Sequence, residues 1–319
     1  MPYYPGKEPV QPEKKDRKKM IRIGAIGLSC ALILYGGIRL VLYGADLAAS
    51  RNTSRELQQM NREPEEPATE TVQAATETTG TPRPEPAETS APVTAAPAPA
   101  RAEEDGMLKP VHYPGSQQPM ITERFLKLRR KSPDIVGWIS LDGVEEAVVQ
   151  RDNTFYLNHD PMGRRNGNGA IFLDEEISLR TRPYTLMLYG HNMKSGNMFG
   201  HLKKYKDIAY YRNHRFVSFD SLYEDGRYVV FAAADIDTVY GTGAWYDLWS
   251  LTTENAAKRE KAIRALEGRS VINVGLDVRA DDQLLLLITC LDGDTERLVV
   301  AARRLREGES EGSLVFRRN

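Results

Sequence analysis

The sequence predicts a mainly β domain, built as a closed sheet or a sandwich of seven or eight short strands, behind one N-terminal membrane-spanning helix. Three observations predict this class. An apolar run lies near the N-terminus, a stretch rich in Pro, Thr, Ala and Glu follows it, and short apolar runs separated by turn residues fill the rest. All three Trp and all eight Phe of the 319 residues lie in that last part, and its length of about 210 residues suffices for one well-cored domain.

The N-terminal segments predict a membrane anchor. Residues 1–22 form a basic tail, and 23–45 carry no charge except Arg39, whose long side chain can reach the membrane interface. About 20 such residues span the hydrocarbon of a bilayer. Because the Lys and Arg residues precede the span, we expect a single-pass protein of the cell membrane with a cytoplasmic N-terminus and an extracellular domain. A cleaved secretory signal is the alternative, but the long basic region favours a retained anchor.

The next segment, 46–106, predicts a disordered stalk. No aromatic residue occurs between Tyr43 and Tyr113, so this stretch has almost nothing to bury and cannot offset the entropy of ordering. It is interpreted as a spacer that lifts the domain off the membrane, and a linker without a length requirement fits equally well. The folded domain is expected over 107–306, with a flexible tail at 307–319.

Composition excludes several kinds of partner. The formal net charge is −1, so there is no broad basic field and we expect no nucleic-acid partner. Cys30 lies in the apolar segment, which leaves Cys290 as the one cysteine of the exported domain. That domain therefore has neither an internal disulfide nor a site made of several cysteines. We expect no metal and no cofactor, and we interpret the acidic residues of the loop after Cys290 as solvated.

The domain begins with an amphipathic helix and continues with short strands. The helix is expected over 121–130, and AspGly at 142–143 is expected to turn the chain between the first two strands. A second helix is expected over 252–268, capped by Thr252 or Thr253 and ended by Gly268. The strand candidates are VGWISL (136–141), EEAVVQ (145–150), GAIFLD (169–174), YTLMLYG (184–190), RFVSFD (215–220), RYVVFAAADI (227–236), LLLLITC (284–290) and RLVVAARR (297–304).

The last two strand candidates place a thiol beside a guanidinium. Cys290 ends one apolar run, the loop LDGDTE follows, and Arg297 opens the next run. If the two runs form a hairpin, both side chains reach the same rim of the sheet, where a guanidinium can bind a carbonyl oxygen or an oxyanion. By itself, a lone Cys is more often a small core residue and a strand-edge Arg more often a solvated charge.

A nucleophilic thiol also needs a proton acceptor, and His191 is the best placed of the five histidines. It follows YTLMLYG directly and so occupies the end of an apolar strand, as Cys290 does. His201 comes one short segment later, and the other three, His112, His159 and His214, lie in polar loops. A thiol, an imidazole and a nearby arginine at neighbouring strand ends indicate a cysteine transpeptidase or peptidase.

Several stretches of this sequence match a known family. They are SPDIVGWISLDG (132–143), VVQRDNTFYLNHD (148–160), GAIFLDEE (169–176), YGHNMKSGNMFGHLKKY (189–205), ITC (288–290) and RLVVAARRL (297–305). Through these motifs and their order, the chain resembles a class B sortase, a membrane-anchored cysteine transpeptidase of Gram-positive cell envelopes.

The resemblance implies a fold and a set of site residues. The fold is a closed β-barrel of about eight strands, with N-terminal helices and a helix inserted before the strand of the catalytic cysteine. Cys290 is the expected nucleophile, His191 the general acid and base, and Arg297 the group that binds the substrate carbonyl or oxyanion. The residues expected to contact the substrate are Thr289, Ile288 and Asn192. Ile288 stands where the family commonly has a small polar residue, which leaves the sorting motif open.

The resemblance also implies partners. Such enzymes cleave a C-terminal sorting motif of exported proteins, form a thioacyl enzyme and pass the acyl group to an amine, usually that of a peptidoglycan precursor. Three other interpretations stay open. They are a sortase that assembles pili, a stalked surface-binding module with Cys290 in its core, and an L,D-transpeptidase, whose Ser-x-Gly-Cys motif is absent from ITCLDG.

Overall fold

The structure, a computed structural model, describes residues 14–62, 106–108, 113, 119–290 and 295–316. The chain divides into two compact units, Met1–Asn52 and Thr53–Asn319. The second unit contains eight strands: β1 (Ile135–Leu141), β2 (Val144–Val149), β3 (Ile171–Leu173), β4 (Thr185–Tyr189), β5 (Phe216–Ser221), β6 (Arg227–Asp237), β7 (Leu284–Cys290) and β8 (Glu296–Arg304).

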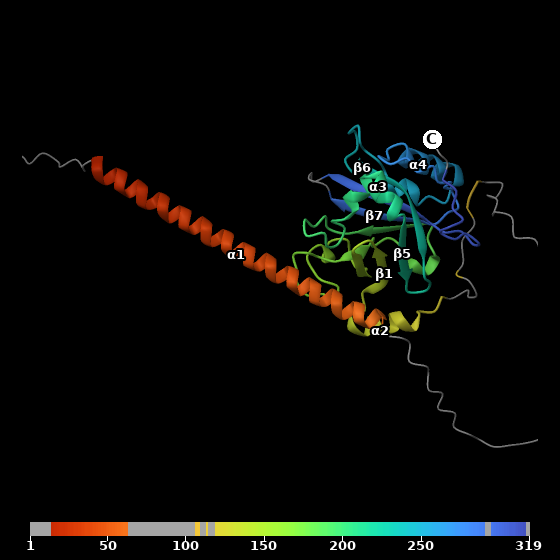
Figure 1. Cartoon of the computed structure of the whole chain (residues 1–319), viewed down its shortest axis with the longest axis horizontal. Coiled ribbons are helices and arrows are strands. Elements are labelled where there is room, and N and C mark those ends of the chain that lie inside the picture. The colour runs from red at the N-terminus through yellow and green to blue at the C-terminus, as the bar shows by residue number, and fades with distance from the viewer. Residues whose placement is uncertain (1–13, 63–105, 109–112, 114–118, 291–294, 317–319) are drawn as a thin grey trace, which may run out of the picture. The chain divides into compact units, whose positions relative to one another are not determined.

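These strands form a closed barrel in the order β1-β2-β3-β4-β7-β8-β6-β5, with β5 pairing back to β1 (Figure 1). The pairs β2–β3 and β4–β7 are parallel, and the other pairs are antiparallel. The predicted mainly β class is confirmed, and the sheet is a closed barrel rather than a sandwich. Each of the eight predicted strands is present within a few residues of its expected bounds.

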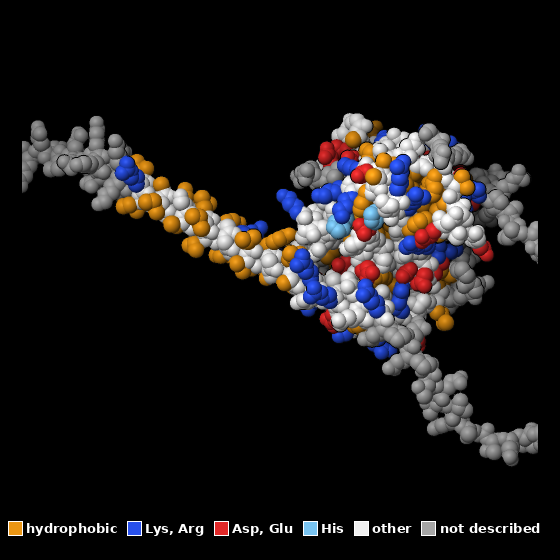
Figure 2. Space-filling model, in the orientation of Figure 1, with side chains coloured by type: hydrophobic (Ala, Val, Ile, Leu, Met, Phe, Trp, Pro, Cys, Tyr) orange, Lys and Arg blue, Asp and Glu red, His pale blue; other side chains and the backbone are white. Residues whose placement is uncertain are grey.

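The first helix, α1, runs over Lys14–Arg62. From Ile21 onward it is long and apolar enough to cross a membrane, judged by length and composition. Figure 2 shows hydrophobic side chains along it, and those between Ile21 and Tyr43 are exposed. The helix therefore includes a candidate membrane anchor where the sequence predicts one.

Residues 46–62, the first part of the expected disordered stalk, are helical instead, because they continue helix α1. Its last turns, from Thr53 on, belong to the second unit. There Leu57 is fully buried, and the Ser54 hydroxyl donates to the Glu146 carboxylate at 2.8 Å. Such tertiary contacts stabilise a helix that local sequence alone does not signal. Residues 63–105 of the expected stalk lie outside the described residues.

The strand on which the site depends is buried from Leu284 to Thr289. In β7, the side chains from Leu284 to Thr289 are all at most 2% exposed. Successive side chains of a strand point to opposite faces, so the burial of consecutive residues shows that both faces of β7 are covered, which explains its unbroken apolar run.

Short helices connect and cover the strands. Besides α1 they are α2 (Glu123–Lys131), η1 (Phe155–Leu157), η2 (Leu179–Thr181), η3 (Leu202–Lys206), α3 (Ile208–Asn213), η4 (Leu248–Leu251) and α4 (Ala256–Glu267). Helix α2 buries Phe125 and Leu128, as its periodicity predicts. Helix α4, which precedes β7, is the expected inserted helix.

The start of α4 differs from the prediction. Its cap is Asn255, whose side-chain oxygen accepts the Lys258 amide at 3.0 Å. Neither threonine caps the helix, because the Thr252 hydroxyl donates to the Trp249 carbonyl and the Thr253 hydroxyl accepts the Asn255 amide. Gly268 ends the helix as expected.

The expected tail after residue 306 is described as far as residue 316 and consists of turns. Glu309 in this segment forms an ion pair at 2.7 Å with Arg303, whose side chain is 1% exposed. Its first residues are therefore tied to the end of β8.

Candidate active site

Strands β4 and β7 run parallel and end at the same rim of the barrel. Tyr189 is the Cα partner of Ile288, and the Gly190 amide donates to the Ile288 carbonyl at 3.1 Å. His191 follows at once, two residues beyond the end of β4. The C-terminal end of β7 is Cys290, so both positions lie at one edge of the sheet.

The next strand places Arg297 opposite Cys290. In the antiparallel β7–β8 ladder, Cys290 is the Cα partner of Arg297, and Thr289 is the partner of Leu298. Directly opposite positions in such a ladder share one face of the sheet. Arg297 is partly exposed and donates to the Glu296 carbonyl at 3.0 Å. The predicted hairpin is confirmed, although residues 291–294 of its loop lie outside the described part.

The imidazole of His191 is oriented by a backbone carbonyl. Its Nε2 lies 2.7 Å from the carbonyl oxygen of Leu157, at the end of η1. A carbonyl oxygen only accepts hydrogen bonds, so Nε2 carries a proton in this arrangement. This leaves Nδ1 as the nitrogen that can take up or release a proton.

Gly169 lets the chain pass close to this imidazole. Its φ is +64°, in the left-handed region, and an added Cβ would lie 2.5 Å from the Tyr156 carbonyl oxygen and 3.1 Å from the His191 ring. Any other residue here would strain the backbone and crowd the histidine. The loop between β2 and β3 is thus fitted closely around His191.

A pocket of about 230 Å³ opens at this rim. It includes four of the predicted site residues, and the full lining is Asn153, Leu157, Ala170, Phe172, Tyr189, Gly190, His191, Ile288, Thr289 and Arg297. Asn192 is not among them, and its backbone forms a bridge with Met198. Its expected contact with substrate therefore stays a prediction.

Thr289 brings a buried hydroxyl to the pocket. Its side chain is 2% exposed, and among the described residues its hydroxyl finds no hydrogen-bond partner. A buried hydroxyl without a partner costs about 1–3 kcal/mol. Because Thr289 also lines the pocket, the hydroxyl is placed to bond with a molecule that enters it.

Sequence reasoning missed several lining residues. Tyr189 stacks on Phe172 with ring centroids 5.4 Å apart. Burial raises the pKa of the Tyr189 phenol, the nearby Asp174 carboxylate raises it further, and the Arg297 guanidinium partly offsets this. The phenol therefore stays neutral at physiological pH. Its position directly before Gly-His is the signal that could have identified it.

Asn153 supports the same wall of the pocket. Its amide nitrogen donates to the Asp174 carboxylate at 3.2 Å, and its side-chain oxygen accepts the Glu175 amide at 3.0 Å. No residue-type pattern in the sequence distinguishes this Asn from the other polar loop residues.

The other described histidines lie elsewhere. His159 stacks on Phe155, His214 stacks on Tyr210, and the Nδ1 of His201 faces the Asp142 carbonyl at 3.3 Å. His112 falls outside the described residues. Within the described part, no group of three His, Cys, Asp or Glu side chains is placed to hold a metal ion.

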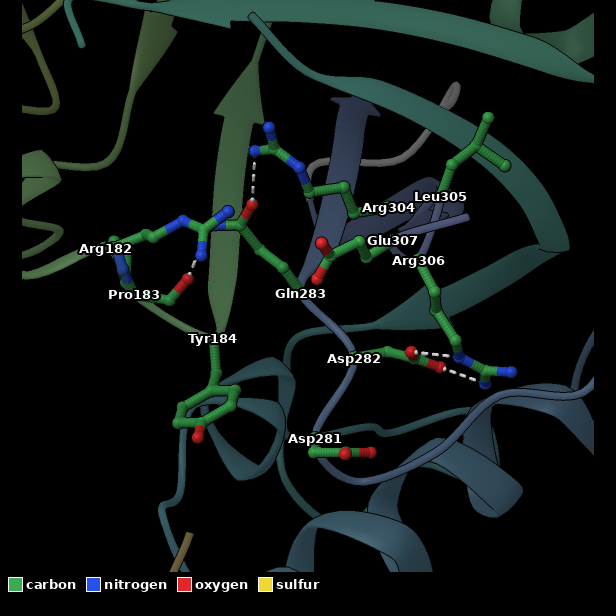
Figure 3. A pocket seen from close by; sticks show the side chains of 10 residues that line it. All are labelled: Arg182, Pro183, Tyr184, Asp281, Asp282, Gln283, Arg304, Leu305, Arg306 and Glu307. Atoms are coloured by element: carbon green, nitrogen blue, oxygen red, sulfur yellow. Dashed lines mark hydrogen bonds and ion pairs between the residues drawn. The ribbon is translucent and has the colours of Figure 1, made fainter. Parts of the chain in front are cut away.

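A larger pocket, lined mainly by charged residues, lies where β4 and β7 begin, at the opposite end of the strands from His191. It measures about 550 Å³ and is lined by ten residues from Arg182 to Glu307 (Figure 3). Two of its charged groups are paired, since Arg306 binds both oxygens of Asp282 at 2.7 Å. The predicted catalytic residues are absent from its lining.

The barrel order and the residues at this rim define the sortase class of fold. A family model described as the Sortase domain matches residues 140–305, and the chain belongs to this family. Within it, the chain is a class B sortase, because its similar relatives are of that class. It is 30% identical over 195 residues to sortase B of Staphylococcus aureus, covering 59% of this chain and 78% of the relative. It is 26% identical over 194 residues to sortase B of Listeria monocytogenes, covering 59% and 74%.

Solved structures of class B sortases agree with this family assignment. A Staphylococcus aureus sortase B–substrate complex superposes with a TM-score of 0.53 at 30% identity, covering 59% of this chain and 87% of that one. A Bacillus anthracis sortase B superposes with a TM-score of 0.51 at 29% identity, covering 61% and 91%. Membership in this family supports a sortase transpeptidase function for the chain.

Proposed function

We propose that this protein is a membrane-anchored cysteine transpeptidase that cleaves a C-terminal sorting motif of exported proteins and transfers the acyl part to a cell-wall amine. One observation supports it most. Cys290 pairs with Arg297 across the β7–β8 ladder, and His191 follows the parallel neighbour β4 at the same rim.

In the first half-reaction, the Cys290 thiolate attacks the carbonyl carbon of the scissile peptide bond. A carbon–sulfur bond forms, and the negative charge moves to the carbonyl oxygen, which the Arg297 guanidinium binds. The carbon–nitrogen bond then breaks. His191, protonated on both nitrogens, gives the Nδ1 proton to the leaving amine, and a thioester to Cys290 remains.

In the second half-reaction, an amine of a peptidoglycan precursor attacks the thioester. Its proton passes to Nδ1 of His191, a new carbon–nitrogen bond forms, and the Cys290 thiolate leaves. The peptide bond lost in the first step is thus replaced by an equivalent amide, so the transfer needs no external energy source.

The pocket at this rim supplies the substrate contacts in this proposal. Ile288 gives it an apolar floor, and the Thr289 hydroxyl, which has no hydrogen-bond partner among the described residues, can bond with the backbone of an extended motif. Asn192, just outside the pocket, is proposed to contact the motif where it leaves the rim. The α1 helix anchors the enzyme in the membrane, with the basic N-terminal end in the cytoplasm and the barrel outside.

The test is an amine-transfer assay on the full-length protein in detergent. A library of sorting-motif peptides is offered with and without an oligoglycine or diamine acceptor, and the products are identified by mass. Wild type should cleave a subset of peptides and join the N-terminal fragment to the amine, while Cys290→Ala and His191→Asn should lose both activities. A binding module would leave every peptide intact, and a pilus-assembling enzyme would prefer the lysine of a protein acceptor.

A further inference from the structure

The loop that carries the Leu157 carbonyl is organised by a buried carboxylate. Asp160 is 2% exposed. One of its oxygens accepts the backbone amides of Met162 and Arg164, each at 3.0 Å. The other accepts the Arg164 Nε at 2.9 Å and the Thr53 hydroxyl at 3.2 Å. Four donors thus converge on this one side chain.

Backbone hydrogen bonds connect the Asp160 turn to the Leu157 carbonyl that contacts His191. The Asp160 amide donates to the Arg164 carbonyl at 2.8 Å, which closes the turn. The Asn166 amide then donates to the carbonyl of Asn158 at 2.9 Å. Asn158 directly follows Leu157, so the peptide group that faces His191 lies next to a residue held by this turn.

Thr53 is the contribution of helix α1 to this arrangement. It is 2% exposed, and its hydroxyl donates to Asp160 while accepting from an Arg164 guanidinium nitrogen. The Asp160 carboxylate, the Arg164 guanidinium and the Thr53 hydroxyl therefore bond to one another; the carboxylate and the hydroxyl are buried, while the Arg164 side chain is 60% exposed. Thr53 lies 107 positions before Asp160 in the chain, so the contact joins the helix end to the active-site loop.

We propose that Thr53 and Asp160 are positioning residues for the transfer reaction. The end of α1 fixes Asp160, the Asp160 turn fixes the Leu157 carbonyl, and this carbonyl holds His191 with its proton on Nε2. The inference rests on the proposed acid–base role of His191. If this inference holds, the C-terminal end of α1 helps to position the catalytic histidine, in addition to connecting the barrel to the candidate membrane anchor.

The physical reason is the directionality of the Nε2 hydrogen bond. At 2.7 Å the carbonyl accepts the Nε2 proton and leaves Nδ1 able to accept one. A shift of about 1 Å in the loop would break this bond, and the imidazole would then sample the other tautomer and other orientations. Misplacement of this size costs about a hundredfold in rate in well-ordered active sites.

The test uses Thr53→Val in the full-length protein in detergent. Valine keeps the shape of threonine and replaces its hydroxyl with a methyl group. We expect kcat for peptide cleavage to fall about tenfold or more, with KM changed less than about twofold, because substrate contacts are untouched. Long-range ¹H–¹⁵N spectra of histidine-labelled protein, assigned with His191→Asn, should change from the Nε2–H pattern to a mixture of tautomers. Asp160→Asn should act in the same direction.

Two controls separate positioning from general damage. Thr53→Ser keeps the hydroxyl and should retain the wild-type kcat and tautomer. Ser54→Ala removes the neighbouring contact of the same helix, which goes to Glu146 on β2 rather than to the loop, and should leave both readouts near wild type. The inference is overturned if Thr53→Val keeps the wild-type kcat and tautomer. It is also overturned if Ser54→Ala lowers kcat and changes the tautomer as much as Thr53→Val does.

Different results would refute the proposed transfer chemistry and the proposed positioning role of Thr53 and Asp160. Full activity of Cys290→Ala or His191→Asn would refute the proposed chemistry, whatever Thr53→Val does. If those two variants are inactive while Thr53→Val behaves as wild type, only the positioning role fails.

Discussion

Arg297 lies opposite Cys290 in the β7–β8 ladder and lines the same pocket as His191 and Tyr189. The sequence predicted that Cys290, His191 and Arg297 occupy one rim, because each lies at the end or the start of an apolar run, and the strand pairing places their backbone positions there. It could not locate the Leu157 carbonyl, because a backbone group carries no residue-type signal. Asp160 was missed for a related reason, since its partner Thr53 lies far away in the sequence.

At the residue scale, replacing Arg297 tests its proposed role in binding the oxyanion. Losing one well-placed donor typically costs about 2.7–4 kcal/mol of barrier, so Arg297→Ala should lower kcat about a hundredfold to a thousandfold. Arg297→Lys keeps the charge but not the planar fork of donors, so its kcat should fall between those of wild type and Arg297→Ala. Steady-state kinetics with a cleaved peptide measures both. An alanine variant with wild-type kcat would remove Arg297 from the mechanism.

At the element scale, the eight strands follow from short apolar runs between turn residues, and the helix at 123–131 follows from apolar periodicity. The helix at 256–267 follows from a composition rich in Ala, Lys, Glu and Arg. The extension of α1 to Arg62 does not, because its last turns depend on contacts with the barrel. Among these is the bond from Ser54 to Glu146. Local sequence could not report a partner that lies in a different strand.

The burial of Glu146 predicts a dependence of stability on pH. Burial raises the pKa of Glu146 from the ordinary 4.5 to about 7, and the Ser54 hydroxyl only partly opposes this. Between these values the folded protein keeps a proton that the unfolded chain has lost, so stability falls as pH rises from about 4.5 to 7. The loss amounts to at most about 3 kcal/mol.

Denaturant unfolding at pH 5 and pH 8, followed by Trp fluorescence, measures this effect. All three Trp lie in the second unit, so the signal reports on that unit. Glu146→Gln cannot titrate, and its stability should change less between the two pH values than that of wild type. Equal changes in both proteins would show that Glu146 is not the responsible group.

At the scale of the whole barrel, one end carries the proposed active site and the other end contains a buried arginine that stabilises the fold. The rim where β4 and β7 end carries the pocket of the proposed chemistry, while the end where they begin is tied together by Arg259. This guanidinium is fully buried and donates to the carbonyls of Leu251, Tyr184 and Asp282 at 2.7–3.0 Å. Burial lowers its pKa to about 10, so it stays charged at neutral pH.

Removing this guanidinium should destabilise the barrel without touching the site. Arg259→Met leaves several buried carbonyls without a donor, each costing about 1–3 kcal/mol, so the unfolding free energy should fall by about 3 kcal/mol or more. The matched control is Arg264→Met on the same helix, which removes an exposed pair with Glu260 and should change stability little. Equal effects of the two substitutions in thermal or denaturant unfolding would contradict this account of Arg259.

The central claim is that Cys290 forms the acyl intermediate, and intact-mass spectrometry tests it most directly. Full-length protein is mixed with a cleavable sorting-motif peptide, quenched in acid and then digested to locate the adduct. The predicted result is a mass increase equal to the N-terminal peptide fragment, carried by Cys290, lost on adding an amine and absent from Cys290→Ala. Peptide cleavage by Cys290→Ala at the wild-type rate, or an adduct on another residue, would contradict the claim.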